Sequence, residues 1–524
     1  MKFPAVTIGA TLLALTSCRS WDEERTNFVN PVNTRFHVEL PKAWRANDLA
    51  AVLDFYAPEL VANPEFLAAK KDLFGRFTAI EGSWYILDDV VQKSRSRRFT
   101  ARTLLKLRGP APGEKRLALE NWYSIEAELR DDAWKIVSET LQSEDYAYSQ
   151  RPAFTEEAAA RGIAFEYKPK QVFDKTGVLR DYTAGSGLGV GDYNSDGRED
   201  VYMVNGSEGV LYRNNGDGTF TDVTKDAHLD EPYAGVGRFA VFADYDNDGH
   251  TDLLIGQLNA PNLLYHNRGD DTFEEVGAQA GLVEQDETVA AAFADFNRDG
   301  NLDLYLVNGG NLLSNHPDPI YNALNARANV LYLSNGDGTF TDRTAQAGVG
   351  HTGWGLAVAT ADYDLDGDVD IFVGNDVGFS VLYRNRGDAT FEDVTLAAGI
   401  VYRGSTMSAA WGDINGDGYP DLFAPAMDSN SRWMISQPGF PSPAQWYVNL
   451  FIRPLVLGVL TEMLYGNRFY LNHGDGTFEE VSDTFAVRRN GWAWSGNFLD
   501  YDQDGDLDIY NINGFLSGED RQDL

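Results

Sequence analysis

The stretch DYDNDGHTD, residues 244–252, concentrates carboxylates at alternate positions of one short loop. Aspartates occupy its first, third, fifth and ninth positions, and a glycine occupies the sixth. Alternating side-chain oxygens, followed by a glycine that permits a sharp bend, form the pattern by which proteins surround a hard divalent cation. No helical periodicity flanks the stretch, and its last aspartate lies nearer than the glutamate that closes an EF-hand loop. The pattern therefore predicts a cation site carried by a β-hairpin.

Five other loops share the pattern D-x-[DN]-x-D-G-x-x-D. An isolated acidic turn is common on a solvated surface, but six turns in register with a repeat predict metal binding. The expected ligands are the side chains at positions 1, 3, 5 and 9 and the backbone carbonyl at position 7. These positions are Asp192, Asn194, Asp196, Arg198 and Asp200 (loop 1); Asp244, Asp246, Asp248, His250 and Asp252 (loop 2); Asp295, Asn297, Asp299, Asn301 and Asp303 (loop 3); Asp362, Asp364, Asp366, Asp368 and Asp370 (loop 4); Asp413, Asn415, Asp417, Tyr419 and Asp421 (loop 5); and Asp500, Asp502, Asp504, Asp506 and Asp508 (loop 6).

The charge of the chain favours the same interpretation. Positions 1, 3, 5 and 9 of the six loops hold 21 carboxylates, and the formal net charge of the chain is −36. Carboxylates packed together without a cation repel one another, which raises some of their pKa values. We expect about six Ca²⁺ ions, because all-protein, oxygen-rich cages favour Ca²⁺ over Mg²⁺. The acidic balance also argues against nucleic-acid binding, which needs a basic surface.

The loops recur with a basic period of about 51 residues and with insertions near 309–328 and 428–465. A second module follows each of the first five loops, as in LYRNNGDGTFTDVT at 211–224. Its Asn-Gly and Asp-Gly pairs favour tight hairpin turns, so each repeat holds four short strands, as a propeller blade does. We expect six blades in 171–524, with 163–178 completing the last one. Seven blades are the alternative, if an insertion hides a degenerate blade.

The N-terminus has the pattern of an export signal. Lys2 precedes the short apolar run Ala5–Leu15, and LTSC at 15–18 resembles the lipobox of bacterial lipoproteins. Cys18, the only cysteine of the chain, is then the predicted lipidation site. An ordinary signal peptide with a chance cysteine is the alternative. We therefore expect a signal peptide at 1–18, a polar tether at 19–30 and a lipid anchor in a bacterial envelope, in the outer membrane on its periplasmic or outer side.

Residues 31–148 have a different pattern, and a connector follows at 149–170. Helical spacing begins after Asn47 or Asp48 and recurs at 66–80. Four strands are predicted at 84–91, 99–107, 117–129 and 134–141. Two helices before a curved antiparallel sheet that ends in DDAWKIVSE resemble the cone-shaped nuclear-transport-factor-like (SnoaL-like) fold. That resemblance implies a small α+β domain with room for a ligand.

The residues outside the loops offer few signs of chemistry. The motifs of serine hydrolases, zinc proteases and P-loop enzymes are missing from the sequence. We interpret His37 as structural and the basic island at 93–98 as a hairpin tip, with docking to an acidic surface as the alternative. The tryptophans near the loops are interpreted as blade core or channel lining, with sugar stacking as the alternative; these are Trp354, Trp411, Trp492 and Trp494. The apolar segment at 448–464 is interpreted as a helix packed on the propeller, with partner docking or membrane contact as alternatives.

The loops together with GDGTFxDVT resemble FG-GAP/VCBS repeats, and most of all the UnbV-like and cartilage-acidic-protein-like group. The resemblance covers about 171–513. Many members of that group carry a further C-terminal segment, and roles tied to it are not expected here. The resemblance implies a mainly β calcium-loop propeller that binds a protein or carbohydrate ligand outside the cytoplasm, as an adhesion or scaffold module. An enzyme with a site in the propeller channel or the N-terminal cone is the alternative.

Overall fold

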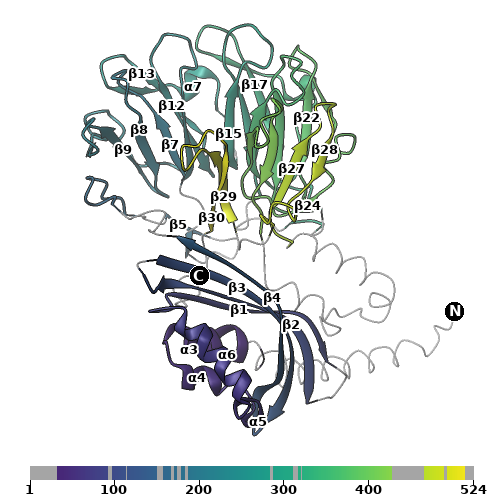
Figure 1. The fold of residues 1–524 in the computed structure, drawn as a ribbon. Coiled ribbons are helices and arrows are strands. Elements are labelled where there is room, and N and C mark those ends of the chain that lie inside the picture. Colours follow the sequence, from purple (N-terminus) through teal and green to yellow (C-terminus); the bar gives the residue numbers. More distant parts are fainter. Residues whose placement is uncertain are drawn as a thin grey trace, which may run out of the picture. The chain divides into compact units, whose positions relative to one another are not determined.

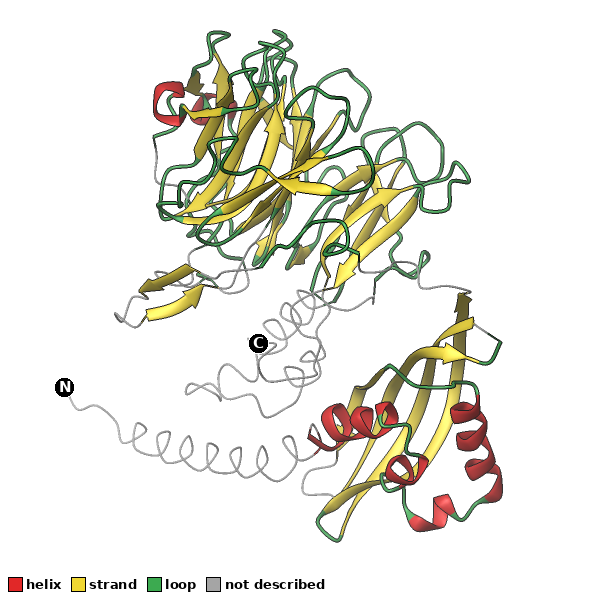
Figure 2. Ribbon diagram, turned by 90° about the vertical axis from the view of Figure 1, so that its left-hand side faces the viewer, coloured by secondary structure: helices red, strands yellow, loops and turns green. Residues whose placement is uncertain are grey.

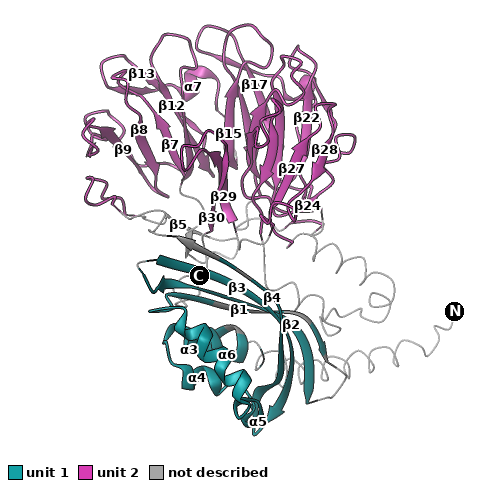
Figure 3. Cartoon of the chain, in the orientation of Figure 1, with its two compact units in different colours: residues 1–156, 430–461 teal, residues 157–429, 462–524 magenta. Residues whose placement is uncertain are grey.

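The computed structural model describes two compact units, one comprising residues 1–156 with 430–461 and the other residues 157–429 with 462–524 (Figure 3). The described residues are 32, 34–92, 97–113, 115–149, 157–166, 170–173, 179–182, 187–283, 287–310, 317–319, 322–427, 465–488 and 493–513. The predicted lipidation site Cys18, the tether and the apolar segment at 448–464 lie outside them. The division after Glu156 falls within the predicted connector.

Short helical segments open the described part of the N-terminal unit. They are η2 (Thr34–Glu39), a π-helix, and the α-helices α3 (Leu40–Arg45), α4 (Leu49–Leu53), α5 (Pro58–Val61) and α6 (Pro64–Gly75). Helix α4 begins at the predicted cap, since the Asp48 carboxylate accepts a hydrogen bond from the Ala51 N–H at 3.0 Å. The helix predicted at 66–80 ends at Gly75. Beyond it, Thr78 and Glu81 donate their N–H groups to the carbonyls of Pro110 and Arg108 and not to a helical turn.

A four-stranded antiparallel sheet completes this unit, in the order β1-β2-β3-β4. Its strands are β1 (Gly82–Gln92), β2 (Arg98–Ala111), β3 (Lys115–Arg130) and β4 (Ala133–Ser149). They confirm the four predicted strands. Alternate residues of β3, among them Leu119 and Ile125, are buried, so the sheet has one core face, and Figure 2 shows the helices against that sheet. The unit is α+β; its likeness to the SnoaL-like fold stays a prediction.

The described residues of the second unit form five four-stranded antiparallel sheets, which we call sheets I to V (Figure 1). In each sheet, strands follow one another in chain order. Sheet I has β7 (Leu188–Gly191), β8 (Asp200–Val204), β9 (Gly209–Asn214) and β10 (Phe220–Asp222); sheet II has β11 (Val236–Ala243), β12 (Asp252–Leu258), β13 (Leu263–Asn267) and β14 (Phe273–Glu275); sheet III has β15 (Thr288–Ala294), β16 (Asp303–Asn308), β17 (Val330–Ser334) and β18 (Phe340–Asp342); sheet IV has β19 (Gly355–Ala361), β20 (Asp370–Asn375), β22 (Val381–Asn385) and β23 (Phe391–Asp393); sheet V has β25 (Ala410–Gly412), β26 (Asp421–Ala424), β27 (Arg468–Asn472) and β28 (Phe478–Glu480).

Smaller elements complete the described part of this unit. Three two-stranded sheets pair β29 (Ala493–Leu499) with β30 (Asp508–Asn513), β5 (Lys170–Phe173) with β6 (Leu179–Tyr182), and β21 (Gly378–Phe379) with β24 (Arg403–Gly404). The short helices α7 (Gly277–Ala280) and α8 (Thr344–Ala347) follow β14 and β18. The mainly β meander sheets are consistent with a β-propeller, while the number of blades, six or seven, stays a prediction.

Neighbouring sheets of this unit share their hydrophobic cores. One core cluster contains Leu211 of sheet I and Ile255 of sheet II, and another contains Val307 of sheet III and Ile371 of sheet IV. Of the predicted core tryptophans, Trp354 is buried, and the half-buried Trp411 ring lies 6.2 Å from the Tyr363 ring. Trp494 is also half-buried, and Trp492 lies outside the described residues. The first strands of successive sheets also contact one another in chain order. The cores therefore lie between sheets, which leaves the connecting loops at the surface.

The segment predicted to complete the last blade takes a different place. Within 163–178, β5 pairs with β6, whereas β29 and β30 pair with each other. Residues just before it contact sheet I instead: Phe220 donates its N–H to the Arg161 carbonyl at 2.7 Å. Phe273 and Ala227 form the same bond between sheets I and II, at 3.1 Å. Residues 157–162 therefore contact sheet I in the same way that the end of one repeat contacts the next sheet. The F-D-x-T motif did not indicate this contact.

Candidate metal-binding loops

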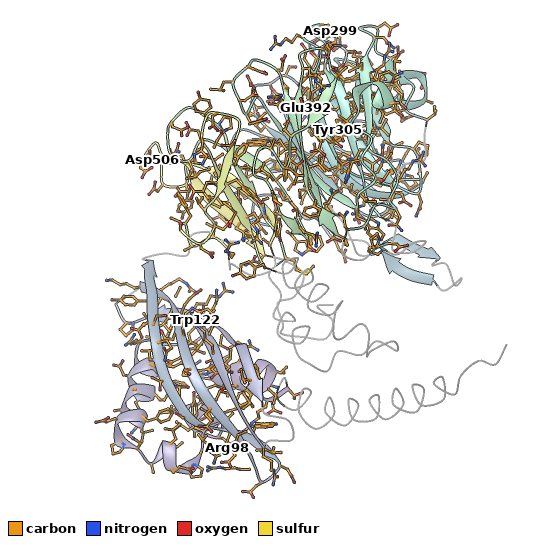
Figure 4. The ribbon with its side chains drawn as sticks, turned by 90° about the vertical axis from the view of Figure 1, so that its right-hand side faces the viewer. Arg98, Trp122, Asp299, Tyr305, Glu392 and Asp506 are labelled. Carbon is orange, nitrogen blue, oxygen red and sulfur yellow. The ribbon has the colours of Figure 1, made fainter. Side chains whose placement is uncertain are left out.

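Each acidic loop connects the first and second strands of a hairpin, as the sequence predicted. Position 9 is the first residue of the second strand in all six loops, from Asp200 in β8 to Asp508 in β30. Figure 4 shows Asp299 of loop 3 and Asp506 of loop 6 at the surface of the unit, whereas Tyr305 lies between strands. The sheets therefore present the six loops in equivalent places of the repeat.

The aspartate at position 1 organises the turn through backbone hydrogen bonds. In loop 2, Asp244 accepts the N–H groups of Asp248 and Gly249, both at 3.0 Å. Equivalent bonds from the position-6 glycine to the position-1 carboxylate occur in every loop, at 2.7–3.0 Å. That glycine has a positive φ, 90° in loop 2, which confirms the predicted sharp bend. Position 4 also has a positive φ, as at Asn247 (61°), although the sequence pattern fixes no residue there.

The aspartate at position 9 ties the loop to the rest of its sheet. In loop 2, Asp252 accepts the Tyr245 N–H at 3.1 Å and the Asn267 N–H, from the third strand, at 2.8 Å. Loops 1, 3, 4 and 5 repeat both bonds, and the side chains at position 9 are fully buried in loops 1 to 5. Position 9 is therefore a structural anchor as well as a candidate ligand.

Position 3 divides the loops into two kinds. Loops 2, 4 and 6 have aspartate there, and in each of them three carboxylates place an oxygen within 4.8 Å of one another. Loops 1, 3 and 5 have asparagine, and in loop 3 the Asn297 amide donates to Asp299 at 2.9 Å. The asparagine supplies one of its hydrogens to a carboxylate that would otherwise face other negative charges. Loops 2, 4 and 6 therefore hold the higher charge for a cation.

Burial and mutual repulsion shift the pKa values of these carboxyls. Burial is the main cause that raises the pKa of Asp252 and Asp370 to about 8, and nearby carboxylates add to it. Burial also raises the pKa of Asp200 and Asp303 to about 6. The groups at position 3 in loops 2 and 4, Asp246 and Asp364, have raised pKa values for the same two reasons. Burial and repulsion thus favour a bound proton or cation at these carboxyls.

The donor sets fit a divalent cation. Oδ1 of Asp246, Asp362 and Asp364 is shielded from solvent and accepts no hydrogen bond from any residue that the structure describes. A buried carboxylate oxygen without a donor is costly unless an ion coordinates it. These oxygens belong to loops 2 and 4, where the carboxylate groups converge. At position 7, whose carbonyl is the expected ligand, the N–H donates to position 5, for example His250 to Asp248 at 2.9 Å.

Side chains that the loop pattern does not specify link neighbouring loops. Asn247 of loop 2 donates to the Gly300 carbonyl of loop 3 at 3.0 Å, and Arg298 of loop 3 donates to the Gly367 carbonyl of loop 4 at the same distance. Asn267 of sheet II reaches the Tyr193 carbonyl of loop 1 at 2.7 Å. Polar side chains therefore link loop 2 to loop 3 and loop 3 to loop 4, whereas loop 1 contacts the third strand of sheet II.

The N-terminal unit contains a buried polar cluster that no sequence pattern indicated. Lys70 of α6 pairs with Glu139 of β4, and both side chains are 4% exposed. Tyr56 donates its hydroxyl to Glu139 at 2.8 Å, and the Lys70 ammonium lies 4.8 Å from the centre of the Tyr123 ring. Lysine in an amphipathic helix normally reaches water, so only the packing of α6 on the sheet reveals this pair.

The acidic hairpins on four-stranded meanders define a repeat protein with a fold consistent with a β-propeller. Residues 192–255, 244–306, 316–373, 362–424 and 456–510 match the FG-GAP-like repeat. These segments cover more than half of the chain, which belongs to the FG-GAP-like repeat family. Proteins of this family are typically adhesion or binding modules.

Curated relatives share part of this region. Cartilage acidic protein 1 of Xenopus tropicalis is 28% identical over 213 residues, which are 38% of this chain and 30% of that protein. The Mus musculus protein is 28% identical over 276 residues, which are 50% of this chain and 39% of that protein. The chain therefore spans roughly a third of the length of the curated relatives it matches.

Two solved structures show a weak likeness. A structure from Agrocybe aegerita, described as recognising non-reducing terminal N-acetylglucosamine, has a TM-score of 0.37 at 18% identity and covers 64% of this chain and 76% of its own. A biofilm matrix protein of V. cholerae has a TM-score of 0.30 at 13% identity and covers 56% of this chain and 38% of its own. Neither likeness bears on what this chain binds.

Proposed function

We propose that this protein is a calcium-loaded binding module of the bacterial cell envelope, anchored by lipid at Cys18. The second unit holds up to six Ca²⁺ ions in its acidic loops and presents a rigid surface to a protein or glycan ligand. The observation that carries the proposal is the convergence of carboxylates in register, with buried oxygens that lack donors in loops 2 and 4. A bound Ca²⁺ takes the place of the hydrogen-bond donors that those oxygens lack.

Rigidity links the cations to binding. Loop 3 contacts both loop 2 and loop 4, and the position-9 aspartates of loops 1 to 5 hold the third strands of their sheets. A cation in a loop therefore stabilises both the hairpin and the surface that neighbouring loops form. An export signal and a lipid anchor fit this role, because millimolar calcium is found outside the cytoplasm, where extracellular calcium modules bind with Kd of about 10⁻⁴ to 10⁻³ M. None of the helices among the described residues is long and apolar enough to cross a bilayer.

The direct test uses the full chain freed of metal by a chelator. Calcium titration followed by calorimetry is expected to show several sites, with the sites of highest affinity in loops 2, 4 and 6, where the charge is greatest. A glycan array and a pull-down from envelope extracts, each run with Ca²⁺ and with chelator, then identify the ligand class. Absence of calcium binding in the titration would refute the proposal, and ligand capture that ignores calcium would refute the link between the loops and binding.

A second candidate function concerns the interior of the N-terminal unit. The Tyr85 and Thr103 hydroxyls are shielded from solvent and lie close to each other, and Asn121 Oδ1, also shielded, has no hydrogen-bond partner within the described residues. They accompany the buried pair of Lys70 and Glu139. An interior with such unsatisfied groups favours a small polar ligand, and the acid and base together would suit an enzyme. Native mass spectrometry tests this second function by comparing the purified wild-type chain with the apolar double variant Lys70→Met/Glu139→Leu.

The two outcomes of that experiment differ clearly. A small molecule that stays bound to the wild-type chain and leaves the variant supports the second function. A buried ion pair without a ligand role is often replaced by apolar side chains at no cost or with a gain in stability. A chain without a bound molecule, together with a variant that unfolds at the same or a higher temperature, would show that the pair is structural.

A further inference from the structure

Loop 2 differs from the other loops in the side chain that the third strand turns toward it. That strand carries His266 at the position occupied by Arg213, Leu333, Arg384 and Leu471 in sheets I, III, IV and V. In all five sheets, the next residue along the third strand donates its N–H to the position-9 aspartate of the loop. Register therefore places the histidine beside the loop carboxylates.

The geometry brings an imidazole nitrogen into the carboxylate cluster. His266 Nδ1 lies 3.3 Å from Asp246 Oδ2 and 3.4 Å from Asp252 Oδ1. It is shielded from solvent, although the side chain as a whole is 29% exposed, and it makes no hydrogen bond. Asp246 Oδ1, in the same cluster, also lacks a donor. Separations of about 3.4 Å are those between two ligands of one tetrahedral ion bound at about 2.1 Å.

The surrounding groups complete a mixed donor set. Asp246 converges with Asp248 and His266 on one side and with Asp244 and Asp252 on the other. The Asp252 side chain is 1% exposed, so its oxygen is fixed by packing and by the Asn267 N–H. His266 Nδ1 thus lies within reach of carboxylate oxygens of both Asp246 and Asp252. Among described residues, loops 4 and 6 also group three carboxylates, but without a histidine.

We propose that loop 2 is a site for a borderline divalent metal of the Zn²⁺ class, held by His266 Nδ1 with Asp246 and Asp252. Imidazole nitrogen suits Zn²⁺ and its neighbours in the transition series, whereas Ca²⁺ takes oxygen ligands. The inference rests on the proposal that the acidic loops hold cations, and assigns a different cation to one of them. The chain then carries two metal chemistries in one repeat array.

Charge neutralisation is the competing role for this side chain. Arginine at the same position in sheets I and IV bears a positive charge beside an acidic loop, and Arg384 pairs with Glu392 at 3.3 Å. The leucines at this position in sheets III and V carry no charge and form no ion pair, so the strand position tolerates an apolar side chain. The matched variants therefore come from the chain itself: His266→Leu removes the nitrogen, and His266→Arg keeps a positive charge without a metal ligand.

The experiment measures Zn²⁺ binding to the metal-free full chain by competition with a chromophoric chelator, with and without millimolar Ca²⁺. We expect one Zn²⁺ per chain that calcium does not displace. Both His266 variants should bind this ion at least about tenfold more weakly, since even loss of an outer-shell partner costs that much. X-ray absorption of the zinc-loaded chain should show an imidazole nitrogen in the wild type alone.

A reciprocal variant sharpens the test. Loop 4 has the same four aspartates as loop 2, and Arg384→His gives it the missing imidazole, which should create a second zinc site. Equal zinc affinity in wild type and His266→Leu, or displacement of zinc by calcium in the wild type, would overturn the inference. The calcium proposal is judged separately in these samples: His266→Leu keeps five loops, so its calcium titration should still show binding even if no zinc site exists.

Discussion

Arg298 in loop 3 donates a hydrogen bond from Nε to the backbone carbonyl of Gly367 in loop 4, at 3.0 Å. Its Nη2 also lies 2.5 Å from Oδ1 of Asp368 at position 7 of that loop. A cation bound in loop 4 would fix the same turn that this guanidinium holds. We therefore expect the occupancy of loop 4 to depend on this contact with loop 3.

Replacing this contact should change both stability and calcium response. Arg298→Ala removes the hydrogen bond to loop 4, so the free energy of unfolding in chelator should fall by about 0.5 to 1.5 kcal/mol. It also removes a positive charge beside the loop, so added calcium should stabilise the variant more than the wild type. Thermal unfolding with and without calcium measures both effects. Arg386→Ala, which removes an exposed arginine paired with Glu392, is the control and should change neither quantity.

Calcium should stabilise the folded chain by mass action. A site with Kd of about 10⁻⁴ to 10⁻³ M contributes about 1.4 to 2.7 kcal/mol at 10 mM Ca²⁺. Several such sites should raise the melting temperature of the second unit clearly above its value in chelator. Scanning calorimetry across a calcium series checks this expectation, with Mg²⁺ at equal ionic strength as the control. A melting temperature that is flat across the series would contradict it.

Loss of the aspartate at position 9 should destabilise the fold itself, whereas loss of the aspartate at position 5 should mainly reduce the stabilisation by calcium. Asp303→Ala leaves the buried N–H groups of Phe296 and Ser334 without an acceptor, which should cost about 2 to 6 kcal/mol even in chelator. Asp299→Ala removes an exposed carboxylate and should mainly reduce the gain from calcium. Denaturant unfolding of both variants in chelator and in calcium separates the effects. Similar losses for the two variants in chelator would show that position 9 is no special anchor.

Acidity should oppose the effect of calcium. The pKa of Asp252 and Asp370 is raised to about 8 in the folded chain, so without a cation the folded state binds more protons than the unfolded state. In chelator, stability from these groups is present near pH 4 and is lost as pH rises toward 8. Calcium competes with the same protons, so its stabilisation should be larger at pH 8 than at pH 5.

Melting curves at both pH values, with calcium and with chelator, measure this dependence. Asp370→Asn removes one titrating group and should flatten the pH dependence in chelator. A calcium gain that is equal at both pH values would show that protons and cations do not compete in these loops.

The segment before sheet I should stabilise the second unit. Gly162 has φ of 87°, and a Cβ there would lie 2.3 Å from the Phe220 carbonyl oxygen. Gly162→Ala should therefore lower the melting temperature more than Gly476→Ala, at a turn glycine with φ of 82° and open space around it. Both variants carry the same backbone strain, so the difference measures the contact alone. Equal effects would mean that residues 157–162 contribute little to the folded unit.

Local patterns allowed much of this fold to be predicted. The four strands of the N-terminal unit and the hairpin setting of every acidic loop follow from alternation and turn residues within a few positions. The end of α6 could not be predicted in the same way, because Thr78 and Glu81 bond to a strand that lies some thirty residues further along the chain. The place of 157–162 against Phe220 likewise depends on a partner almost sixty residues away.

The sequence by itself determined that six loops place oxygens at positions 1, 3, 5 and 9 around a glycine bend, since nine residues contain both the ligands and the turn. Only the tertiary structure decided which groups join them. Strand register brings His266 to Asp246 and Asp252, loop proximity brings Arg298 to Gly367, and helix packing buries Lys70 against Glu139. These pairs arise from the packing of distant segments, which no local spacing encodes.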